Sequence, residues 1–473
     1  MIEERIVSNQ ILWQPDQTRI DQSNMTRFRQ HINNTYDLEL QNFEELYQWS
    51  LLFAEAFWLE MWNFGQIISH SPHSRVVDDL SKMPGAKWFI GATLNYTENL
   101  LRFRDDKIAI HFRGETEVEH SLTYAELYAQ VARAARAMEK AGITQGDRIA
   151  GFIPNIPEAI IAMLAAASIG AIWSSSSPDF GIKGVLDRFS QIEPRIVFAA
   201  DGYFYGGKRF DSLEKLQGIL KSLPSVEKVV IINYTKTEAF SLPDKGIHWE
   251  QFIDNNASEI TFAPLPFNHP LYIMYSSGTT GLPKSIVHSV GGTLIQHLKE
   301  HLLHCDLSRD DTLFYFTTCG WMMWNWLAGG LAVGATLTLY DGNPFYPDPG
   351  ALWKMADQLE VSIFGTSAKY IDALERSGYK PASSVPLTKL RAVLSTGSPL
   401  SEESFDYVYR DIKHDVLLAS ISGGTDILSC FVLGNPVLPV YRGELQSRGL
   451  GMRVEAYNDD GKSVLRESGE LVC

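Results

Sequence analysis

Residues 271–284 read Leu-Tyr-Ile-Met-Tyr-Ser-Ser-Gly-Thr-Thr-Gly-Leu-Pro-Lys, an apolar run that passes into a loop of glycine and hydroxyl residues. The run Leu271–Tyr275 predicts a buried strand, and Ser276–Lys284 predicts the loop that follows it. Glycines let several backbone N–H groups converge on an anion, hydroxyls add donors, and Lys284 adds a positive charge. Two residues separate the last glycine from Lys284, so the loop does not match G-x-x-x-x-G-K-[ST]. The stretch therefore predicts a phosphate-binding loop of another class, with Gly278 and Gly281 in backbone conformations that other residues avoid.

The surrounding chain alternates between strand-like and helix-like runs. The first runs are Ile108–Phe112, Tyr124–Ala141, Arg148–Ile153, Pro157–Ile172 and Ile196–Ala200, and strand-like runs continue at Val229–Ile232, Leu271–Tyr275, Thr312–Thr317, Thr336–Tyr340 and Ala392–Ser395. This alternation is typical of βαβ units. Near the end, Arg453–Tyr457 and Glu470–Cys473 flank the turn residues Asn458–Gly461 and predict a hairpin. The predicted fold class is α/β, with helix-covered, mainly parallel sheets and a smaller β subdomain.

The first part of the chain has a different character. Residues 1–104 are rich in aromatic side chains, and Asn42–Phe64 has helical periodicity with its aromatics on one side. We therefore expect residues 1–104 to pack as a segment on a larger domain that spans residues 105–473. The apolar run Ala159–Trp173 is too short for a membrane span and is interpreted as a buried helix.

Composition and charge exclude several functional classes. The formal net charge is −15, which argues against a nucleic-acid partner or an anionic membrane surface. The cysteines Cys305, Cys319, Cys430 and Cys473 are scattered, so they support neither a disulfide framework nor a zinc knuckle. Buried reduced thiols, no signal peptide and a cytoplasmic location are the expectation.

Several motifs beyond the loop point to one family. They are Met83–Phe89 with Leu94–Asn99, Gly320-Trp321, Ser395–Pro399, Gly423–Asp426 and Gly469–Val472. Together with the loop, and in this order, they resemble the motifs of the adenylate-forming superfamily, and the first two segments resemble its acetyl- and acetoacetyl-CoA synthetase branch. The resemblance covers essentially the whole chain and implies the fold of that superfamily's large N-terminal domain.

The resemblance also implies roles in binding ATP. Thr279, Thr280 and Lys284 are expected to hold the β- and γ-phosphates, as catalytic residues of adenylate formation, with Ser276, Ser277, Gly278 and Gly281 completing the loop. Gly397, Ser398 and Pro399 are expected to line the adenine, with Ser422 where relatives place an aromatic ring. Thr425 is expected to meet the α-phosphate and Asp426 to hold Mg²⁺.

The acid and CoA are the remaining implied substrates. Trp321, Met322, Met323, Thr396 and Gly423 are expected to wall the acyl pocket, and Gly423 stands where acetate-specific relatives carry a Trp. The extra space favours acetoacetate, and a ligase for another short-chain acid is the alternative. Phe180, Lys208 and Arg209 resemble the region that receives CoA. The sequence leaves the oligomeric state open.

The C-terminal end bears on activity. Gly469–Val472 resembles the motif that closes the large domain, so the chain is expected to be cut before the hinge and to lack the mobile C-terminal domain. The prediction is then a chain inactive in full turnover. If the chain does end at Cys473, a non-catalytic nucleotide-binding protein is the alternative.

A second motif indicates a different chemistry. His297-Leu298-Lys299-Glu300-His301 spells H-x-x-E-H, and His304 lies one turn further along, so a zinc hydrolase is a rival interpretation. Such a short pattern arises by chance in a chain with 12 His, and it directly follows the phosphate loop. A solvated or capped helix is the prediction for this segment.

Overall fold

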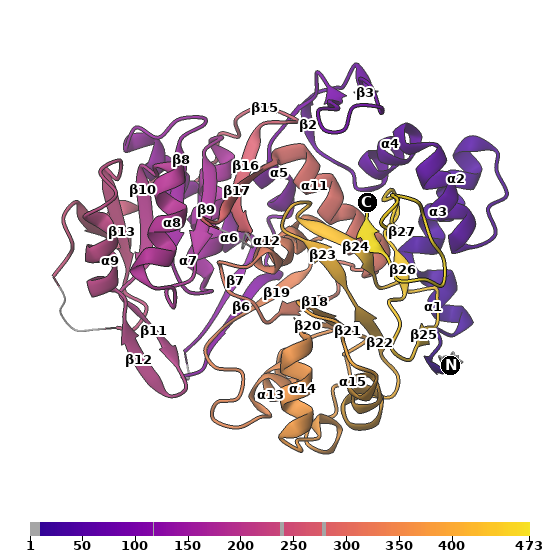
Figure 1. The fold of residues 1–473 in the computed structure, drawn as a ribbon. Helices are drawn as coiled ribbons and strands as arrows, with labels where there is room; N and C mark the ends of the chain where they lie inside the picture. The colour runs from indigo at the N-terminus through magenta and orange to yellow at the C-terminus, as the bar shows by residue number, and fades with distance from the viewer. Residues whose placement is uncertain (1–9, 117, 237–240, 277–280) are drawn as a thin grey trace.

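Two seven-stranded sheets form the framework of the computed structural model, which describes residues 10–116, 118–236, 241–276 and 281–473 (Figure 1). The first sheet has the order β14 (Gly246–His248), β13 (Lys228–Ile232), β10 (Ile196–Ala200), β8 (Arg148–Phe152), β9 (Ile172–Ser176), β16 (Pro270–Ser276) and β17 (Lys284–Ser289). The second has the order β22 (Leu417–Ser420), β21 (Ala392–Thr396), β20 (Ile363–Ser367), β18 (Thr312–Tyr315), β19 (Thr336–Asp341), β6 (Ile108–Gly114) and β7 (Glu119–Thr123).

Each sheet is parallel except at one edge. The antiparallel pairs are β16 with β17 in the first sheet and β6 with β7 in the second. Every other neighbouring pair runs parallel. Parallel strands require crossover connections, which helices supply. The predicted α/β class is confirmed.

Helices cover both sheets and fill the space between them. They are α5 (Tyr96–Leu100), α6 (Tyr124–Lys140), α7 (Pro157–Ser168), α8 (Ile182–Ile192), α9 (Leu213–Leu220), α10 (Trp249–Phe252), α11 (Val290–Lys299), α12 (Met322–Gly329), α13 (Ala351–Gln358), α14 (Ala368–Arg376) and α15 (Glu402–Tyr407). A capping box of Thr123 and Glu126 starts α6, since each side chain accepts a backbone N–H of the other residue. Pro157 occupies the first turn of α7, where no N–H is needed, and nearly all of α7 is buried.

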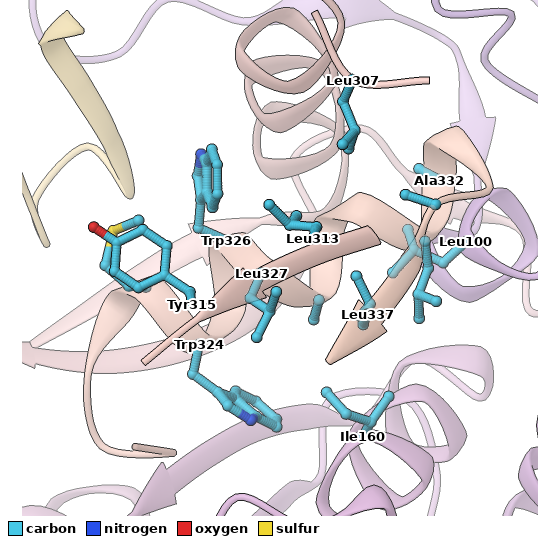
Figure 2. Packing of buried hydrophobic residues seen from close by; sticks show 14 of the residues in the cluster. Leu100, Ile160, Leu307, Leu313, Tyr315, Trp324, Trp326, Leu327, Ala332 and Leu337 are labelled. Carbon is cyan, nitrogen blue, oxygen red and sulfur yellow. The ribbon is translucent and has the colours of Figure 1, made fainter. Parts of the chain in front are cut away.

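The core continues from the first sheet's helices into α12. Figure 2 shows Trp324 and Trp326 on opposite sides of α12, with Trp324 near Ile160 of α7. The Trp324 indole donates to Asn155 Oδ1 at 3.0 Å, so its buried N–H is satisfied. Trp326 points the other way, and its indole N–H donates to Glu300 Oε2.

The N-terminal segment packs against the C-terminal part of the chain. Its helices are α1 (Gln17–Gln22), α2 (Asn24–Tyr36), α3 (Phe43–Leu52) and α4 (Ala54–Phe64), and Figure 1 draws them beside β26 and β27. The Tyr47 hydroxyl donates to Met452 O at 2.9 Å, and Arg448 pairs with Glu44 at 3.0 Å. The single helix predicted over Asn42–Phe64 is wrong, because Phe53 leaves helical geometry at φ −119°, ψ 50° and divides it.

Short strands make the smaller β elements. They are β1 (Ile11–Trp13) with β25 (Val440–Tyr441), β15 (Leu265–Pro266) with β5 (Thr93–Leu94) and β2 (Ser69–Ser71), β3 (Arg75–Val77) with β4 (Trp88–Ile90), β11 (Gly202–Tyr205) with β12 (Lys208–Asp211), β23 (Ser422–Gly424) with β24 (Ser429–Leu433) and β26 (Ser447–Arg448), and β27 (Glu455–Tyr457) with β28 (Glu470–Val472). The last pair is the predicted C-terminal hairpin. Shorter helical turns are η1 (Glu300–His304), η2 (Gly330–Val333), η3 (Pro381–Ser383) and η4 (Val408–Ile412).

One boundary prediction is wrong for a physical reason. The apolar run Ala159–Trp173 is not one helix, because α7 ends at Ser168, Gly170 adopts φ +81°, and Ile172 begins β9. Buried helices and buried parallel strands are both continuously apolar, so only the glycine marks the break. Over the described residues, no helix has the length and apolarity that a bilayer crossing requires.

Candidate active site

A cavity of about 510 Å³ lies at the carboxyl ends of the second sheet's parallel strands. Its lining includes the residues predicted for the acid, the adenine and the α-phosphate, which are Trp321, Met322, Met323, Thr396, Gly397, Ser398, Pro399, Gly423 and Thr425. Ligands of open α/β sheets bind at this edge, because loops leaving adjacent strands converge there. Segments about one hundred residues apart in sequence therefore meet in one hollow.

The turn after β21 forms one side of the cavity. Thr396 ends the strand and its Oγ1 donates to Ile421 O at 2.9 Å, which ties this turn to the segment after β22. Gly397 has φ +90°, a conformation that disfavours any side chain. A Cβ built on Gly397 would lie 3.9 Å from the Trp321 ring, so the turn runs close to the opposite wall.

Two further walls come from α12 and from the β23–β24 hairpin. Trp321 caps α12, Met322 and Met323 begin it, and both methionines are buried. On the other side, Ser429 and Cys430 of β24 line the cavity and are also buried. The cavity is thus held between a helix start and a hairpin.

Gly423 lines the cavity, and its backbone lies very close to the neighbouring strand β24. A Cβ at Gly423 would lie 2.2 Å from Ser429 O, so the backbones of β23 and β24 approach too closely for any side chain. A side chain at this position requires the two strands to separate, and the expectation that Gly423 opens acyl space stays a prediction. In this backbone, glycine permits the close contact between β23 and β24.

The predicted phosphate loop follows β16, which pairs antiparallel with β17. Ser276 ends β16, Lys284 begins β17, and the two residues face each other in the register. Gly281 has φ +103°, which confirms the expectation for that glycine. Ser277, Gly278, Thr279 and Thr280 lie outside the described residues. Lys284 is exposed.

Gln191 of α8 hydrogen-bonds to the residues on both sides of Lys284. Gln191 Nε2 donates to Pro283 O at 2.9 Å, and its Oε1 accepts from Ser285 Oγ at 2.8 Å. Both neighbours of the lysine are therefore fixed by one amide group. Nothing in the sequence pattern around Gln191 signals this contact.

β17 also reaches the turn that carries Thr425 and Asp426. Burial lowers the pKa of His288, while a hydrogen bond to the Thr425 backbone and the charge of Asp426 act in the opposite direction. His288 is therefore neutral at pH 7. This contact places the phosphate-loop hairpin beside the predicted α-phosphate and metal residues.

Asp426 offers one exposed carboxylate. Among the residues that the structure describes, no three His, Cys, Asp or Glu side chains gather to hold a metal. Mg²⁺ commonly binds through one or two carboxylates while keeping waters and substrate phosphate oxygens. A lone carboxylate beside the cavity fits that ion.

The residues predicted for CoA lie on two separate elements. Phe180 lies near the start of α12, since a Cβ on Gly320, the residue before Trp321, would lie 3.7 Å from its ring. Lys208 and Arg209 are exposed on β12, and Arg209 Nε donates to Thr235 Oγ1 at 2.9 Å. Lys215 links the two regions, because its Nζ donates to Pro178 O at 3.1 Å and lies 6.0 Å from the Tyr203 ring of β11.

A carboxylate that the sequence did not signal holds the tip of the β11–β12 hairpin. Glu115 accepts the backbone N–H groups of Gly206, Gly207 and Asn343, each at 2.8 Å. Both glycines have positive φ, as a tight hairpin turn requires. The tip directly before Lys208 is thereby fixed to the second sheet.

The H-x-x-E-H segment is neither solvated nor a metal site. The side chains of His297, Glu300, His301 and His304 are all buried. The histidine rings hydrogen-bond to separate backbone carbonyls, of Leu428, Trp326 and Gly434, at 2.9 to 3.0 Å. Burial lowers the pKa of His297 to about 4 and those of His301 and His304 to about 3, so all three are neutral. The helix is capped, because the Ser289 side chain accepts from Gly292 N at the start of α11, but it is buried and the expectation of a solvated helix is wrong. The zinc alternative gains no support from this geometry.

The fold and this site define an enzyme of the adenylate-forming class. The family described as AMP-binding enzyme matches residues 97–473, and the acetyl-coenzyme A synthetase N-terminus matches residues 43–100. The chain belongs to the AMP-binding enzymes and, within them, to the acetoacetyl-CoA synthetase family. Enzymes of this family use ATP, Mg²⁺ and CoA.

Individual relatives support the assignment to the acetoacetyl-CoA synthetase family. The chain is 50% identical to acetoacetyl-CoA synthetase of Gallus gallus over 481 residues, covering 100% of this chain and 72% of the relative. It is 51% identical to acetoacetyl-coenzyme A synthetase of Rhizobium meliloti (strain 1021), covering 98% and 71%. The solved acetoacetyl-CoA synthetase from Streptomyces lividans superposes with a TM-score of 0.93 at 42% identity, covering 98% of this chain and 72% of that one. The expected inactivity of the chain is not borne out by these comparisons.

Proposed function

We propose that the chain ligates acetoacetate to CoA in two steps that share the cavity. In the first, a carboxylate oxygen of acetoacetate attacks the α-phosphorus of ATP, the bond to the β-phosphate breaks, and pyrophosphate leaves. In the second, the CoA sulfur attacks the carbonyl carbon of the acetoacetyl-adenylate, loses its proton, and AMP leaves. The observation that carries the proposal is the convergence of the acid, adenine and α-phosphate residues in one cavity.

Each group of residues has a distinct task in the first step. Lys284 neutralises charge that develops on the leaving pyrophosphate, and the Thr279 and Thr280 hydroxyls donate hydrogen bonds to it. Gly397, Ser398 and Pro399 hold the adenine, and Thr425 orients the α-phosphate. Asp426 would hold Mg²⁺, which supplies charge neutralisation on the phosphates when bound.

The acid lies between the walls of α12 and the β23–β24 hairpin. Trp321, Met322, Met323 and Thr396 give it an apolar surface, with Gly423 permitting the hairpin to close. Phe180, Lys208 and Arg209 receive CoA from the side of β12. A cytoplasmic location belongs to the same proposal, since Cys305, Cys319 and Cys430 are buried free thiols.

Acid-dependent exchange of pyrophosphate into ATP tests the first step. With Mg²⁺ present, we expect acetoacetate to support exchange with a kcat/KM at least about tenfold above that for acetate. Mass spectrometry then checks for acetoacetyl-CoA after CoA is added. Exchange with acetate or butyrate alone would establish a different short-chain ligase. ATP binding without exchange for any acid would leave a nucleotide-binding protein and overturn the proposal.

A further inference from the structure

A charged pair is enclosed beneath the proposed acyl pocket. Lys299 ends α11 and Glu300 begins the π-helical turn η1, and both side chains are fully buried. Lys299 Nζ lies 3.7 Å from Glu300 Oε1, an ion-pair distance that is too long for a hydrogen bond. Replacing a buried ion pair with apolar side chains is often neutral or stabilising. Stability alone therefore gives little reason for a carboxylate at this position.

Three donors converge on the Glu300 carboxylate. Oε2 accepts the Trp326 indole N–H at 2.8 Å, while Oε1 accepts the Cys430 N–H at 3.0 Å and the Ser429 hydroxyl. A carboxylate suits this arrangement because both of its oxygens accept and neither must donate. A glutamine amide would place an N–H group against one of these donors.

The donors belong to the two walls that face each other across the cavity. Trp326 lies on α12, one turn after Met322 and Met323, and Figure 2 shows it on the side of α12 opposite Trp324. Ser429 and Cys430 line the cavity from β24. One buried carboxylate thus bonds both walls at once.

The two histidines on either side of Glu300 also contact these two walls, one each. His301 Nε2 lies 2.9 Å from Trp326 O on the α12 side, and His297 Nε2 lies 3.0 Å from Leu428 O on the hairpin side. Gln296 adds a bond from Nε2 to Ser429 Oγ at 2.6 Å. The H-x-x-E-H motif therefore joins the same two elements through several independent hydrogen bonds.

We propose that Glu300 is a positioning residue that sets the separation of the α12 and β24 walls and thereby determines which acids the cavity admits. Bonds to a charged acceptor are short and strong, so this spacing resists widening. The inference rests on the proposed function, because it concerns selection of the acid at the same cavity. It gives the H-x-x-E-H motif a role that involves no metal.

The test measures acid selectivity, because a loss of stability alone would not change the ratio of kcat/KM for two acids. We compare kcat/KM for hexanoate and for acetoacetate by pyrophosphate exchange in the enzyme and in Glu300→Gln. The ratio of hexanoate to acetoacetate should rise by about tenfold or more, while KM for ATP changes by less than about threefold. Trp326→Phe, which removes one donor and keeps an aromatic ring, should move the ratio in the same direction by a smaller factor.

Asp311→Asn is the matched control. Asp311 is also a buried carboxylate in a charged pair, bonded to Arg391 at 2.8 and 2.9 Å, but it precedes β18 at the strand end away from the cavity. This variant should lower thermal stability and leave the acid ratio unchanged.

Each outcome decides the inference. An unchanged ratio in folded Glu300→Gln, or a control that shifts it equally, overturns it. If Glu300→Gln does not fold, Trp326→Phe decides on the same ratio. If the enzyme activates another acid in place of acetoacetate, the proposed function fails, and the ratio measured against that acid still decides the role of Glu300.

Discussion

Lys284 is exposed, and the residues on both sides of it are fixed by hydrogen bonds. Gln191 bonds to Pro283 and to Ser285, so the lysine starts from a defined point at the beginning of β17. Preorganisation of this kind lets a charge act on the transition state without being reordered during the reaction.

Lys284→Ala should therefore slow adenylate formation and spare the thioester step. We expect the pyrophosphate exchange rate to fall by about 100-fold, a usual loss when one group that stabilises transition-state charge is removed. Thioester formation from supplied acetoacetyl-adenylate should change by less than about threefold. Lys183→Ala, which removes an exposed lysine paired to Asp187, is the control and should change neither step. Equal losses in both half-reactions would contradict the role of Lys284.

Gly423 gives a prediction that differs from a simple filling of the pocket. Because its Cβ would meet Ser429 O at 2.2 Å, even Gly423→Ala must push β24 away from β23. Activity with acetoacetate and with acetate should fall together, by roughly tenfold each, as the shared wall moves. The measurement is the ratio of the two kcat/KM values, which should stay within about twofold.

Gly184→Ala serves as the control, since among the described residues a Cβ there meets just the flexible end of Arg188, at 3.8 Å. A selective loss with acetoacetate alone would show that Gly423 gates the pocket by size.

At the residue scale, motif spacing predicted which side chains share the cavity but not what supports them. Gly397, Thr425 and Trp321 each lie in a short sequence motif, and the order of these motifs along the chain matches that of the adenylate-forming family. Glu300 bonds to residues 26 to 130 positions away, so no local pattern reveals its partners. Its burial in the interior also could not be read from an apparently polar helix.

At the element scale, the β11–β12 hairpin projects from the first sheet and is tied to the second by one side chain. Glu115 follows β6, and its three bonds reach the hairpin tip and Asn343. Gly342 leaves room for this, because a Cβ there would lie 2.4 Å from Glu115 Cβ. The hairpin carries Lys208 and Arg209, so its position sets where the proposed CoA contacts lie.

Glu115→Ala should weaken CoA without affecting adenylate formation. We expect KM for CoA to rise by about tenfold, because the tip loses two charge-assisted bonds, those from Gly206 and Gly207, and samples other positions. The effect should shrink when dephospho-CoA replaces CoA, if Lys208 and Arg209 contact the terminal phosphate. Glu119→Ala, on β7 and paired with Arg113, is the control. An unchanged KM for CoA would show that the tip holds its position without Glu115.

Strands were predicted more accurately than helix breaks. The strand cores of β6, β10 and β19 match their apolar runs within two residues, because turn residues bound each run. The break at Phe53 and the end of α7 at Ser168 carry no proline, and the sequence continues apolar through both. Tertiary packing decided these points, and a single sequence does not contain that information.

At the scale of the whole molecule, the two sheets meet through polar as well as apolar contacts. Tyr234 follows β13 of the first sheet, and its hydroxyl donates to Asp341 Oδ2 at 3.0 Å, at the end of β19 in the second. Burial raises the pKa of Asp341 to about 7, and the nearby charges of Glu115 and Asp179 add to the effect. The junction between the sheets therefore contains a carboxyl group that titrates near neutrality.

Asp341 should make global stability depend on pH in a defined window. Below about pH 4 the group is protonated in both the folded and the unfolded chain. As pH rises toward 7, the unfolded chain releases this proton and the folded chain retains it, so the free energy of unfolding falls.

The variant Asp341→Asn tests this dependence, because it has no carboxyl group to titrate and its amide oxygen can still accept the Tyr234 hydroxyl. The free energy of unfolding of the variant should therefore rise relative to that of the parent between pH 5 and pH 8, by on the order of 3 kcal/mol. Urea unfolding at both pH values measures this difference, and Asp348→Asn, whose carboxyl pKa lies below its usual value beside Lys354, should show no such gain. A constant difference between Asp341→Asn and the parent across this range would mean that Asp341 is ionised in the folded molecule.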